Sequence, residues 1–192
     1  DVGQGDATLI KHKDQEMLID CGKSSDGHYV AQQLKNLGVD TLEFLMFTHI
    51  DSEHVGGCDE VLEELEVNEV YYNGHSENTY LFNDVKNVAN NMQTVNKNRE
   101  IFIGDSKLKV LNAGISDNND ENAITTLLSY AGTKILLMSD CTDICESNIV
   151  LGGVEADILK VTKHGSIQGT SLKFIEQVNP EKTILSVGPN DY

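Results

Sequence analysis

The chain of 192 residues is poor in basic, aromatic and proline residues. Its 14 lysines and arginines stand against 31 aspartates and glutamates, which gives a formal net charge of −17. A surface this acidic repels phosphate backbones, and with no tryptophan and 6% aromatic residues it offers no obvious stacking platform for bases. We therefore expect no extended nucleic-acid footprint. No apolar run approaches the roughly 18 residues that indicate a membrane span.

The sequence also lacks the marks of a domain boundary. It has two prolines, no repeats and no Pro/Ser-rich linker, and its length is within the roughly 50–250 residues of most domains. We predict a single domain over residues 1–192. The chain begins without Met and already in motif-like sequence, so we expect both ends to be truncated. A bacterial cytoplasmic location and a cell-surface or secreted one are both compatible, and the oligomeric state is open.

Cysteine is scarce, and its four positions have no CxxC spacing: Cys21, Cys58, Cys141 and Cys145. Four cysteines in a chain this long are too few for a disulfide scaffold. Cys141 and Cys145 are spaced so that they could share one helix face. We predict free, partly buried thiols.

The hydrophobic pattern predicts strands that alternate with helices in each half of the chain. In the first half, strands are predicted over residues 7–11, 16–19, 42–47 and 67–72, and helices over 29–37, 61–65 and 81–92. In the second half, strands are predicted over 101–103, 108–111, 123–130, 134–138, 157–161 and 183–187, helices over 144–151 and 171–178, and a surface loop over 116–121. Each half begins with strands, which fits an α/β fold of two sheets with helices outside, a four-layer sandwich, better than one doubly wound sheet.

Residues 48–57, Thr-His-Ile-Asp-Ser-Glu-His-Val-Gly-Gly, directly follow the apolar strand 42–47. Four potential metal ligands occur within six residues: His49, Asp51, Glu53 and His54. A loop at the end of a buried strand can bring such side chains together, and imidazole with carboxylate suits Zn, Mn or Fe. The alternative is an acidic solvated loop with two incidental histidines. Because the chain has only six histidines, we favour the metal site.

Further polar residues come directly after other buried-strand patterns. Asp140 follows strand 134–138, and His164 follows strand 157–161. Each alone is more typical of a cap or turn, but together with the first cluster they predict ligands gathered at one sheet edge. Asp20, after strand 16–19, is predicted to orient a ligand rather than touch metal. Lys163 could hold a substrate phosphate or carboxylate, and a solvent-facing lysine is an equal alternative.

The sequence resembles the metallo-β-lactamase superfamily, and within it the hydrolase domain of ComEC-type competence proteins. The matching segments run nearly end to end in the family's order: 1–7 (DVGQGDA), 18–22 (LIDCG), 48–57, 122–125 (Asn-x-x-Thr), 136–140, 159–166 (LKVTKHGS) and 186–192 (SVGPNDY). The resemblance implies an αββα sandwich with a mono- or dinuclear metal site at one edge. The superfamily motif H-x-H-x-D-H falls on His49, Asp51, Glu53 and His54.

The resemblance also implies roles for these residues. His49 and Asp51 would hold one metal ion, Glu53, His54 and His164 the other, and Asp140 would bridge them. The expected cofactor is one or two zinc ions, with Mn or Fe as alternatives. A metal-bound hydroxide would attack a phosphodiester or another small phosphoester, and the catalytic positions would be Asp51, Glu53, Asp140 and Lys163.

The sequence departs from the family pattern at several of these positions. Asp51 replaces the usual second histidine, Glu53 replaces an aspartate, and Lys163 stands where the branch has the first histidine of His-His-Gly-Ser. No histidine corresponds to the one that many members carry between the first cluster and Asp140. The alternative function is therefore a catalytically degenerate fold that serves as a binding or regulatory module.

Overall fold

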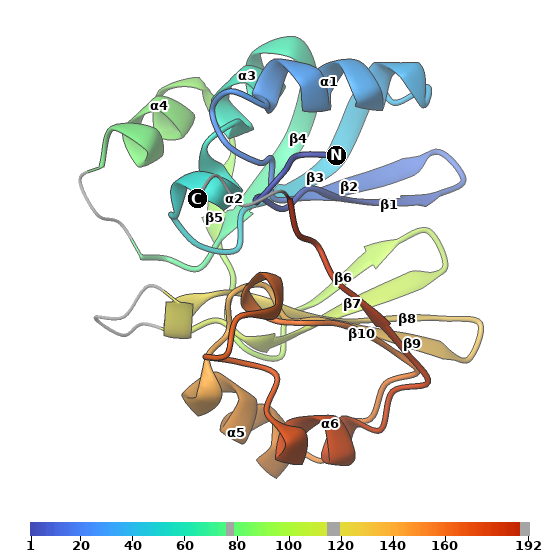
Figure 1. Cartoon of the computed structure of the whole chain (residues 1–192). Coiled ribbons are helices and arrows are strands. Elements are labelled where there is room, and N and C mark those ends of the chain that lie inside the picture. The colour runs from blue at the N-terminus through green and yellow to red at the C-terminus, as the bar shows by residue number, and fades with distance from the viewer. Residues whose placement is uncertain (76–78, 115–119, 189–192) are drawn as a thin grey trace.

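The computed structural model describes residues 1–75, 79–114 and 120–188, and shows two stacked sheets between two layers of helices (Figure 1). The first sheet has the order β1-β2-β3-β4-β5. Its strands are β1 (Thr8–His12), β2 (Gln15–Ile19), β3 (Thr41–Met46), β4 (Glu66–Tyr72) and β5 (Met92–Thr94). β1 is antiparallel to β2, and β2 to β5 are parallel to one another.

The second sheet has the order β11-β10-β9-β8-β7-β6. Its strands are β6 (Glu100–Ile103), β7 (Ser106–Asn112), β8 (Thr125–Tyr130), β9 (Thr133–Leu137), β10 (Ile158–Lys160) and β11 (Lys182–Ile184). β6 to β9 are antiparallel, whereas β9, β10 and β11 are parallel. The carboxyl ends of β2, β3, β9 and β10 thereby become available at one edge of the sandwich.

The helices lie on the two outer faces (Figure 1). The first sheet is covered by α1 (Gly27–Asn36), α3 (Cys58–Glu64) and α4 (Tyr80–Val88), with the single turn α2 (Ser52–Val55) beside them. The second sheet is covered by α5 (Asp143–Leu151) and α6 (Leu172–Val178). Two 3₁₀ turns, η1 (Asp120–Asn122) and η2 (Lys163–Gly165), lie in the loops of the second half.

Three apolar clusters separate the four layers. On β2, Leu18 points to the helices of the first half, whereas Met17 and Ile19 point to the second sheet. This alternation is the period of two that a strand imposes on its side chains. A third cluster, which includes Leu136 and Phe174, lies between the second sheet and its helices. The predicted four-layer α/β sandwich is confirmed.

One predicted helix is too long. The helix expected over residues 81–92 ends at Val88, and Met92 already begins β5. Asn90 and Asn91 are poor helix formers, and the carbonyl of Asn91 accepts a hydrogen bond from the amide of Val70 on β4. The segment after Val88 therefore pairs with β4 of the first sheet instead of continuing the helix. Of the loop expected over 116–121, residues 116–119 are outside the described part, and Asp120 belongs to η1.

The prediction of free, partly buried thiols is wrong. Cys21 is bonded to Cys58 and Cys141 to Cys145, and all four side chains are buried. The amide of Cys21 donates to the carbonyl of His54 at 2.8 Å, which brings two cysteines 37 residues apart to a Cα–Cα distance of 5.2 Å. Spacing along the chain could not indicate this pairing, because tertiary packing creates it.

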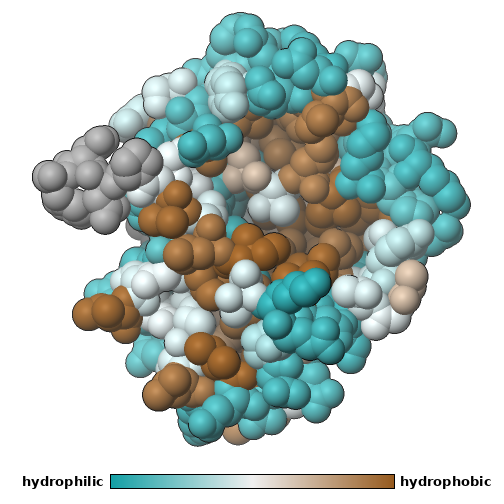
Figure 2. All heavy atoms as spheres, turned by 45° about the vertical axis from the view of Figure 1, so that its right-hand side comes forward, coloured by the Kyte–Doolittle hydropathy of each residue, from teal (hydrophilic) through white to brown (hydrophobic). Residues whose placement is uncertain are grey.

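Two surface properties complete the description. No helix in the described ranges combines the length and the apolar character needed to cross a membrane. Figure 2 shows hydrophobic side chains gathered where this face of the molecule is hollowed. A groove of about 390 Å³ runs between α1, β1 and the segment after β11, and its apolar lining includes Leu9, Tyr29, Leu37 and Leu185.

Candidate metal centre

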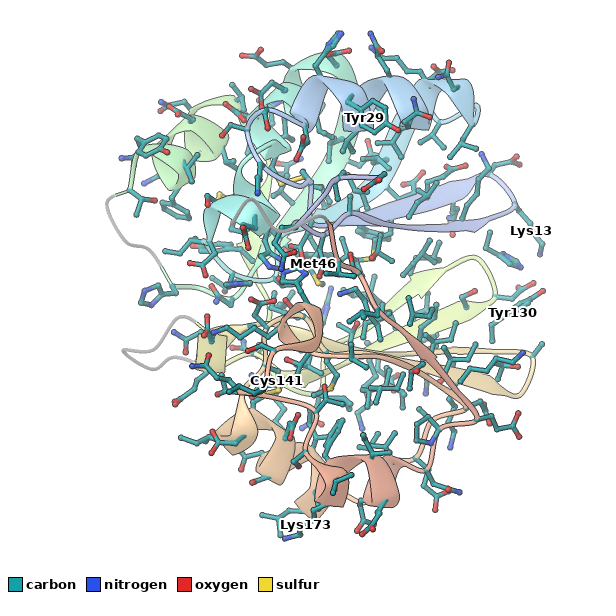
Figure 3. All side chains as sticks on the ribbon, viewed as in Figure 1. Lys13, Tyr29, Met46, Tyr130, Cys141 and Lys173 are labelled. Carbon is teal, nitrogen blue, oxygen red and sulfur yellow. A yellow bond between two sulfur atoms is a disulfide. The ribbon has the colours of Figure 1, made fainter. Side chains whose placement is uncertain are left out.

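The candidate site lies between the two sheets, where four strands end. Asp20 directly follows β2, and Asp140 and His164 follow β9 and β10 within a few residues. The segment after β3 carries His49 and leads into α2, which carries His54. Figure 3 shows a group of side-chain nitrogens beside Met46, the last residue of β3. Side chains from both halves of the chain therefore meet at one edge.

A buried carboxylate fixes the orientation of His54. Its Nδ1 lies 2.9 Å from Asp20 Oδ2, and because a carboxylate only accepts, Nδ1 donates. Asp20 also accepts from the amide of Thr48 at 2.8 Å and from its hydroxyl. Both Asp20 and His54 are almost completely buried. Nε2 of His54 is thus left to face the site, in the manner of a carboxylate that supports a metal-ligating histidine.

The other two histidines are also held through Nδ1. Nδ1 of His164 donates to the backbone carbonyl of Ser186 at 3.0 Å, and Nδ1 of His49 lies 3.0 Å from the hydroxyl of Thr48. The hydroxyl of Thr48 is in turn 2.7 Å from that of Ser139, which precedes Asp140. A short network therefore links the histidine motif to the second sheet.

These contacts leave a set of ligand atoms gathered around Asp140. Its Oδ1 lies 3.2 Å from His54 Nε2 and 3.7 Å from His164 Nε2. Nε2 of His49, His54 and His164 and Oδ1 of Asp140 are all buried and have no hydrogen-bond partner among the described residues. Buried polar atoms are nearly always paired, so a convergent group of unpaired nitrogens and oxygens fits a metal ion.

Charge interactions within the group shift two pKa values in opposite directions. Burial lowers the pKa of His54, but the charge of Asp20, the close carboxylate of Asp140 and the hydrogen bond to Asp20 outweigh burial and raise that pKa well above its usual range. Burial raises the pKa of Asp140, but the close contact with His54 and the charges of His54, His49 and His164 outweigh it, and the pKa is strongly lowered. Both shifts have one cause, the attraction between carboxylates and imidazoles at this edge; a metal ion bound here would take the place of the proton on Nε2 of His54, while Asp140 is already negative.

The structure brings some of the sequence-predicted ligands together and leaves Asp51 and Glu53 outside. Two groups of side chains have ligand atoms within 4.8 Å of one another: Asp6 with His54, Asp140 and His164, and His49 with Asp120 and Asp140. Asp51 and Glu53 belong to neither group in the described part of the chain. Asp51 Oδ2 lies 3.5 Å from His49 Nε2 on a half-exposed side chain, and Glu53 lies 3.6 Å from Lys23 Nζ.

Lys163 lies at the rim of the site. Its ammonium donates to the carboxylate of Asp120, which belongs to the group around His49. The sequence alone fits a substrate-binding lysine and a solvent-facing lysine equally well. In the structure the side chain of Lys163 is only 26% exposed and points toward the ligand group.

Sequence reasoning missed two members of these groups. Asp6 precedes a strand rather than following one, so the pattern of polar residues after buried strands does not include it. Asp120 is part of a polar run that reads as a loop. Its position between the histidine motif and Asp140 in the sequence was the available signal, since the family's additional histidine comes from that interval.

Four of the nine non-glycine residues with a positive φ angle in the described part of the chain lie at this edge. Asp20, Ser139, Lys163 and His164 have φ angles between 48° and 61°, in the left-handed region that residues other than glycine seldom adopt. Each directly follows or closely follows a strand that contributes to the site. Such clusters occur where a side chain must be aimed and the surrounding fold holds it there.

Comparison with known proteins agrees with this geometry. Residues 1–90 match the metallo-beta-lactamase superfamily. ComE operon protein 3 of Bacillus subtilis (strain 168) is 24% identical over 217 residues, which cover 100% of this chain and 28% of that protein. Recombination protein 2 of Haemophilus influenzae is 26% identical over 196 residues, covering 98% and 24%. The chain thus spans about a quarter of the length of these two relatives.

The fold has solved counterparts as well. The class B3 di-zinc metallo-beta-lactamase LRA-12 from an Alaskan soil metagenome superposes with a TM-score of 0.58 at 14% identity, over 80% of this chain and 70% of that one. The fold and the match of residues 1–90 make the chain similar to the metallo-β-lactamase superfamily. Over nearly its whole length the chain resembles ComEC-type competence proteins. The superfamily supports metal-dependent hydrolysis as the general class of activity.

Proposed function

We propose that this chain is a metal-dependent hydrolase that cleaves a phosphodiester or another small phosphoester. The observation that carries the proposal is the group of buried, unpaired ligand atoms around Asp140, drawn from both halves of the fold. A decayed site would not keep three imidazoles aimed at one carboxylate. Zinc is the first candidate cofactor, since the solved neighbour LRA-12 is described as di-zinc, and Mn or Fe would also suit these ligands.

Different residues would bind the metal, orient its ligands and position the substrate. His49, His54, Asp140 and His164 would hold the metal, and Asp20 keeps His54 in the tautomer that presents Nε2. A bound ion of this kind lowers the pKa of water and stabilises negative charge that develops on a phosphoryl oxygen. At the open side of the ligand group, Lys163 would balance the negative charge of the substrate, and Asp51 would help to position it.

A polar cavity beside the ligand group supports a small phosphoester as substrate. It has a volume of about 620 Å³, and Asp120, Thr142 and Lys163 contribute to its lining. Thr142 caps the nine-residue helix α5, so the positive end of that helix faces the cavity, and the Thr142 hydroxyl is buried with no partner in the described ranges. An ammonium, a hydroxyl and a helix N-terminus are groups that bind phosphate oxygens.

The charge of the chain supports a small substrate over a long one. A net charge of −17 opposes an extended nucleic-acid strand, because each phosphate contact would need a lysine or arginine. Glu121, Asp143 and Glu146 also line the cavity. Lys163, which donates to Asp120, is the one cationic side chain among its described lining residues, so the cavity can neutralise one phosphate at most. A nucleotide or a cell-surface phosphodiester would place no more than one phosphate group in the cavity.

Hydrolysis of bis(4-nitrophenyl) phosphate with Zn²⁺ or Mn²⁺ supplied tests the proposal. We expect Asp140→Asn to abolish turnover while leaving the far-UV circular dichroism spectrum unchanged. Asp14→Asn, the same change in the exposed turn between β1 and β2, serves as the control and should retain full activity. Wild-type protein that binds metal but cleaves neither this compound nor a panel of phosphoesters would refute the hydrolase and favour the binding module.

A further inference from the structure

Backbone contacts hold Asp6 next to the histidine motif. The amide of Asp6 donates to the carbonyl of Glu53 at 3.1 Å, and the carbonyl of Asp6 accepts from the amide of Gly22 at 2.8 Å. The preceding residue must be glycine, because a Cβ at Gly5 would lie 2.7 Å from the Glu53 carbonyl oxygen. The segment before β1 is therefore fixed against both α2 and the end of β2.

The side chain of Asp6 is buried, and its two oxygens have different surroundings. Oδ2 accepts from Nζ of Lys160 on β10 at 2.5 Å, and both side chains are less than 10% exposed. Oδ1 is buried and has no hydrogen-bond partner in the part of the chain that the structure describes. Asp6 offers a ligand atom within 4.8 Å of those of His54, Asp140 and His164. One oxygen is thus occupied by the lysine, and the carboxylate still faces the ligand group.

Glu53, the position of the superfamily's carboxylate ligand, has the opposite arrangement. Its side chain is 36% exposed, and Oε1 lies 3.6 Å from Nζ of Lys23 at the surface. The backbone carbonyl of Glu53, and not its carboxylate, faces inward and holds Asp6. The extra methylene of glutamate relative to aspartate accompanies this outward placement.

We propose that Asp6 is the carboxylate ligand of the metal ion held by His54, Asp140 and His164, in the position that the family motif assigns to Glu53. Lys160 orients Asp6 by holding Oδ2, so that Asp6 binds through Oδ1 alone. This inference rests on the metal site of the proposed function and adds to it a ligand from outside the histidine motif. Two carboxylates and two imidazoles form a donor set that suits zinc or manganese.

Metal binding to purified protein tests this assignment without any substrate. Apo-protein would be titrated with Zn²⁺ and, separately, Mn²⁺ by calorimetry, and bound metal would be counted by elemental analysis after dialysis. We expect Asp6→Asn to lose one equivalent or to bind it at least about 100-fold more weakly, since even supporting residues change affinity by about 10–100-fold. Glu53→Gln should keep the wild-type stoichiometry.

Lys160→Met provides the matched control, because it breaks the same buried ion pair while leaving the Asp6 carboxylate in place. We expect it to keep the wild-type stoichiometry and to weaken binding by no more than about 10-fold, a smaller loss than in Asp6→Asn, because the ligand remains and only its orientation is loosened. If Asp6→Asn does not fold, the double variant Asp6→Asn/Lys160→Met removes both charges and carries the same expectation as Asp6→Asn.

The outcomes are distinct. Unchanged binding in Asp6→Asn, or loss of metal in Glu53→Gln instead, overturns the assignment. Equal loss in Asp6→Asn and Lys160→Met also overturns it, since the ion pair and not the ligand would then matter. Wild-type protein that binds no metal refutes both this inference and the proposed function. Wild-type protein that binds metal with the expected pattern in the variants but hydrolyses nothing refutes the function alone.

Discussion

In the first half of the molecule a carboxylate orients His54, whereas in the second half a backbone carbonyl orients His164. Asp20 holds Nδ1 of His54, and the carbonyl of Ser186 holds Nδ1 of His164. Both arrangements aim Nε2 at Asp140. The first depends on one side chain that a mutation can remove, and the second depends on the path of the chain after β11. A point mutation can therefore remove the group that orients His54, but not the one that orients His164.

The largest effect is expected from removing the carboxylate of the first half. Asp20→Ala leaves Thr48 and His54 without their buried acceptor, and loss of one partner of a buried charged pair costs about 3–5 kcal/mol. Metal affinity should fall by about 10–100-fold. Urea unfolding and calorimetric titration with Zn²⁺ measure the two effects.

The variant Asp20→Asn separates the effect on stability from the effect on metal affinity. The asparagine oxygen can still accept from Thr48, so most stability should return, but an amide toward Nδ1 no longer holds His54 in the required tautomer. Wild-type metal affinity in Asp20→Asn would mean that the carboxylate supports the fold and not the ligand.

The two disulfides extend the comparison. Cys21–Cys58 closes a separation of 37 residues beside Asp20 and His54, whereas Cys141–Cys145 closes a separation of four beside Asp140. Because cross-linking a longer loop removes more entropy from the unfolded chain, Cys21→Ala/Cys58→Ala should lower the free energy of unfolding by about 4 kcal/mol and Cys141→Ala/Cys145→Ala by about 2 kcal/mol. Urea titration of both double variants under oxidising conditions decides this, and equal losses would contradict it.

The sequence could predict the features that depend on local pattern, but not those that depend on tertiary packing. Buried runs that end in Asp20, His49, Asp140 and His164 were visible because strands of one sheet edge leave their polar residues where the apolar pattern stops. The outward direction of Glu53 and the pairing of Cys21 with Cys58 were not visible, since both depend on how α2 packs against the segment around Gly22. Local pattern predicts which residues lie at strand ends, and only packing decides which of them converge.

A carboxylate on an outer helix of each half also differs in its surroundings, and we expect a smaller effect there. On α5, the buried Glu146 accepts from the amides of Thr170 and Ser171. On α3, Oε2 of Glu60 is buried without a partner among the described residues. Burial, and then a hydrogen bond with Asp59, raise the pKa of Glu60 from 4.5 to about 7.

The folded state therefore keeps a proton on Glu60 that the unfolded state has lost between pH 4.5 and about 7, so the free energy of unfolding decreases as pH rises through this window. Glu60→Gln should remove that decrease and stabilise the protein at pH 8 by about 1 kcal/mol, after allowance for solvent screening. Glu146→Gln should be destabilising at every pH. Thermal unfolding from pH 4 to pH 8 checks both, and a parallel pH profile for Glu60→Gln and wild type would contradict the assignment.

The smallest effect is expected at Ser186, and it tests the second half of the comparison directly. Ser186→Ala removes a hydroxyl that donates to the carbonyl of Gly5 at 3.2 Å, which should cost no more than about 1 kcal/mol. The carbonyl that holds His164 belongs to the backbone and remains, so Zn²⁺ affinity should stay within about twofold of wild type, against the 10–100-fold loss expected at Asp20. A loss at Ser186 as large as that at Asp20 would show that side chains, and not the course of the backbone, position the histidines in both halves.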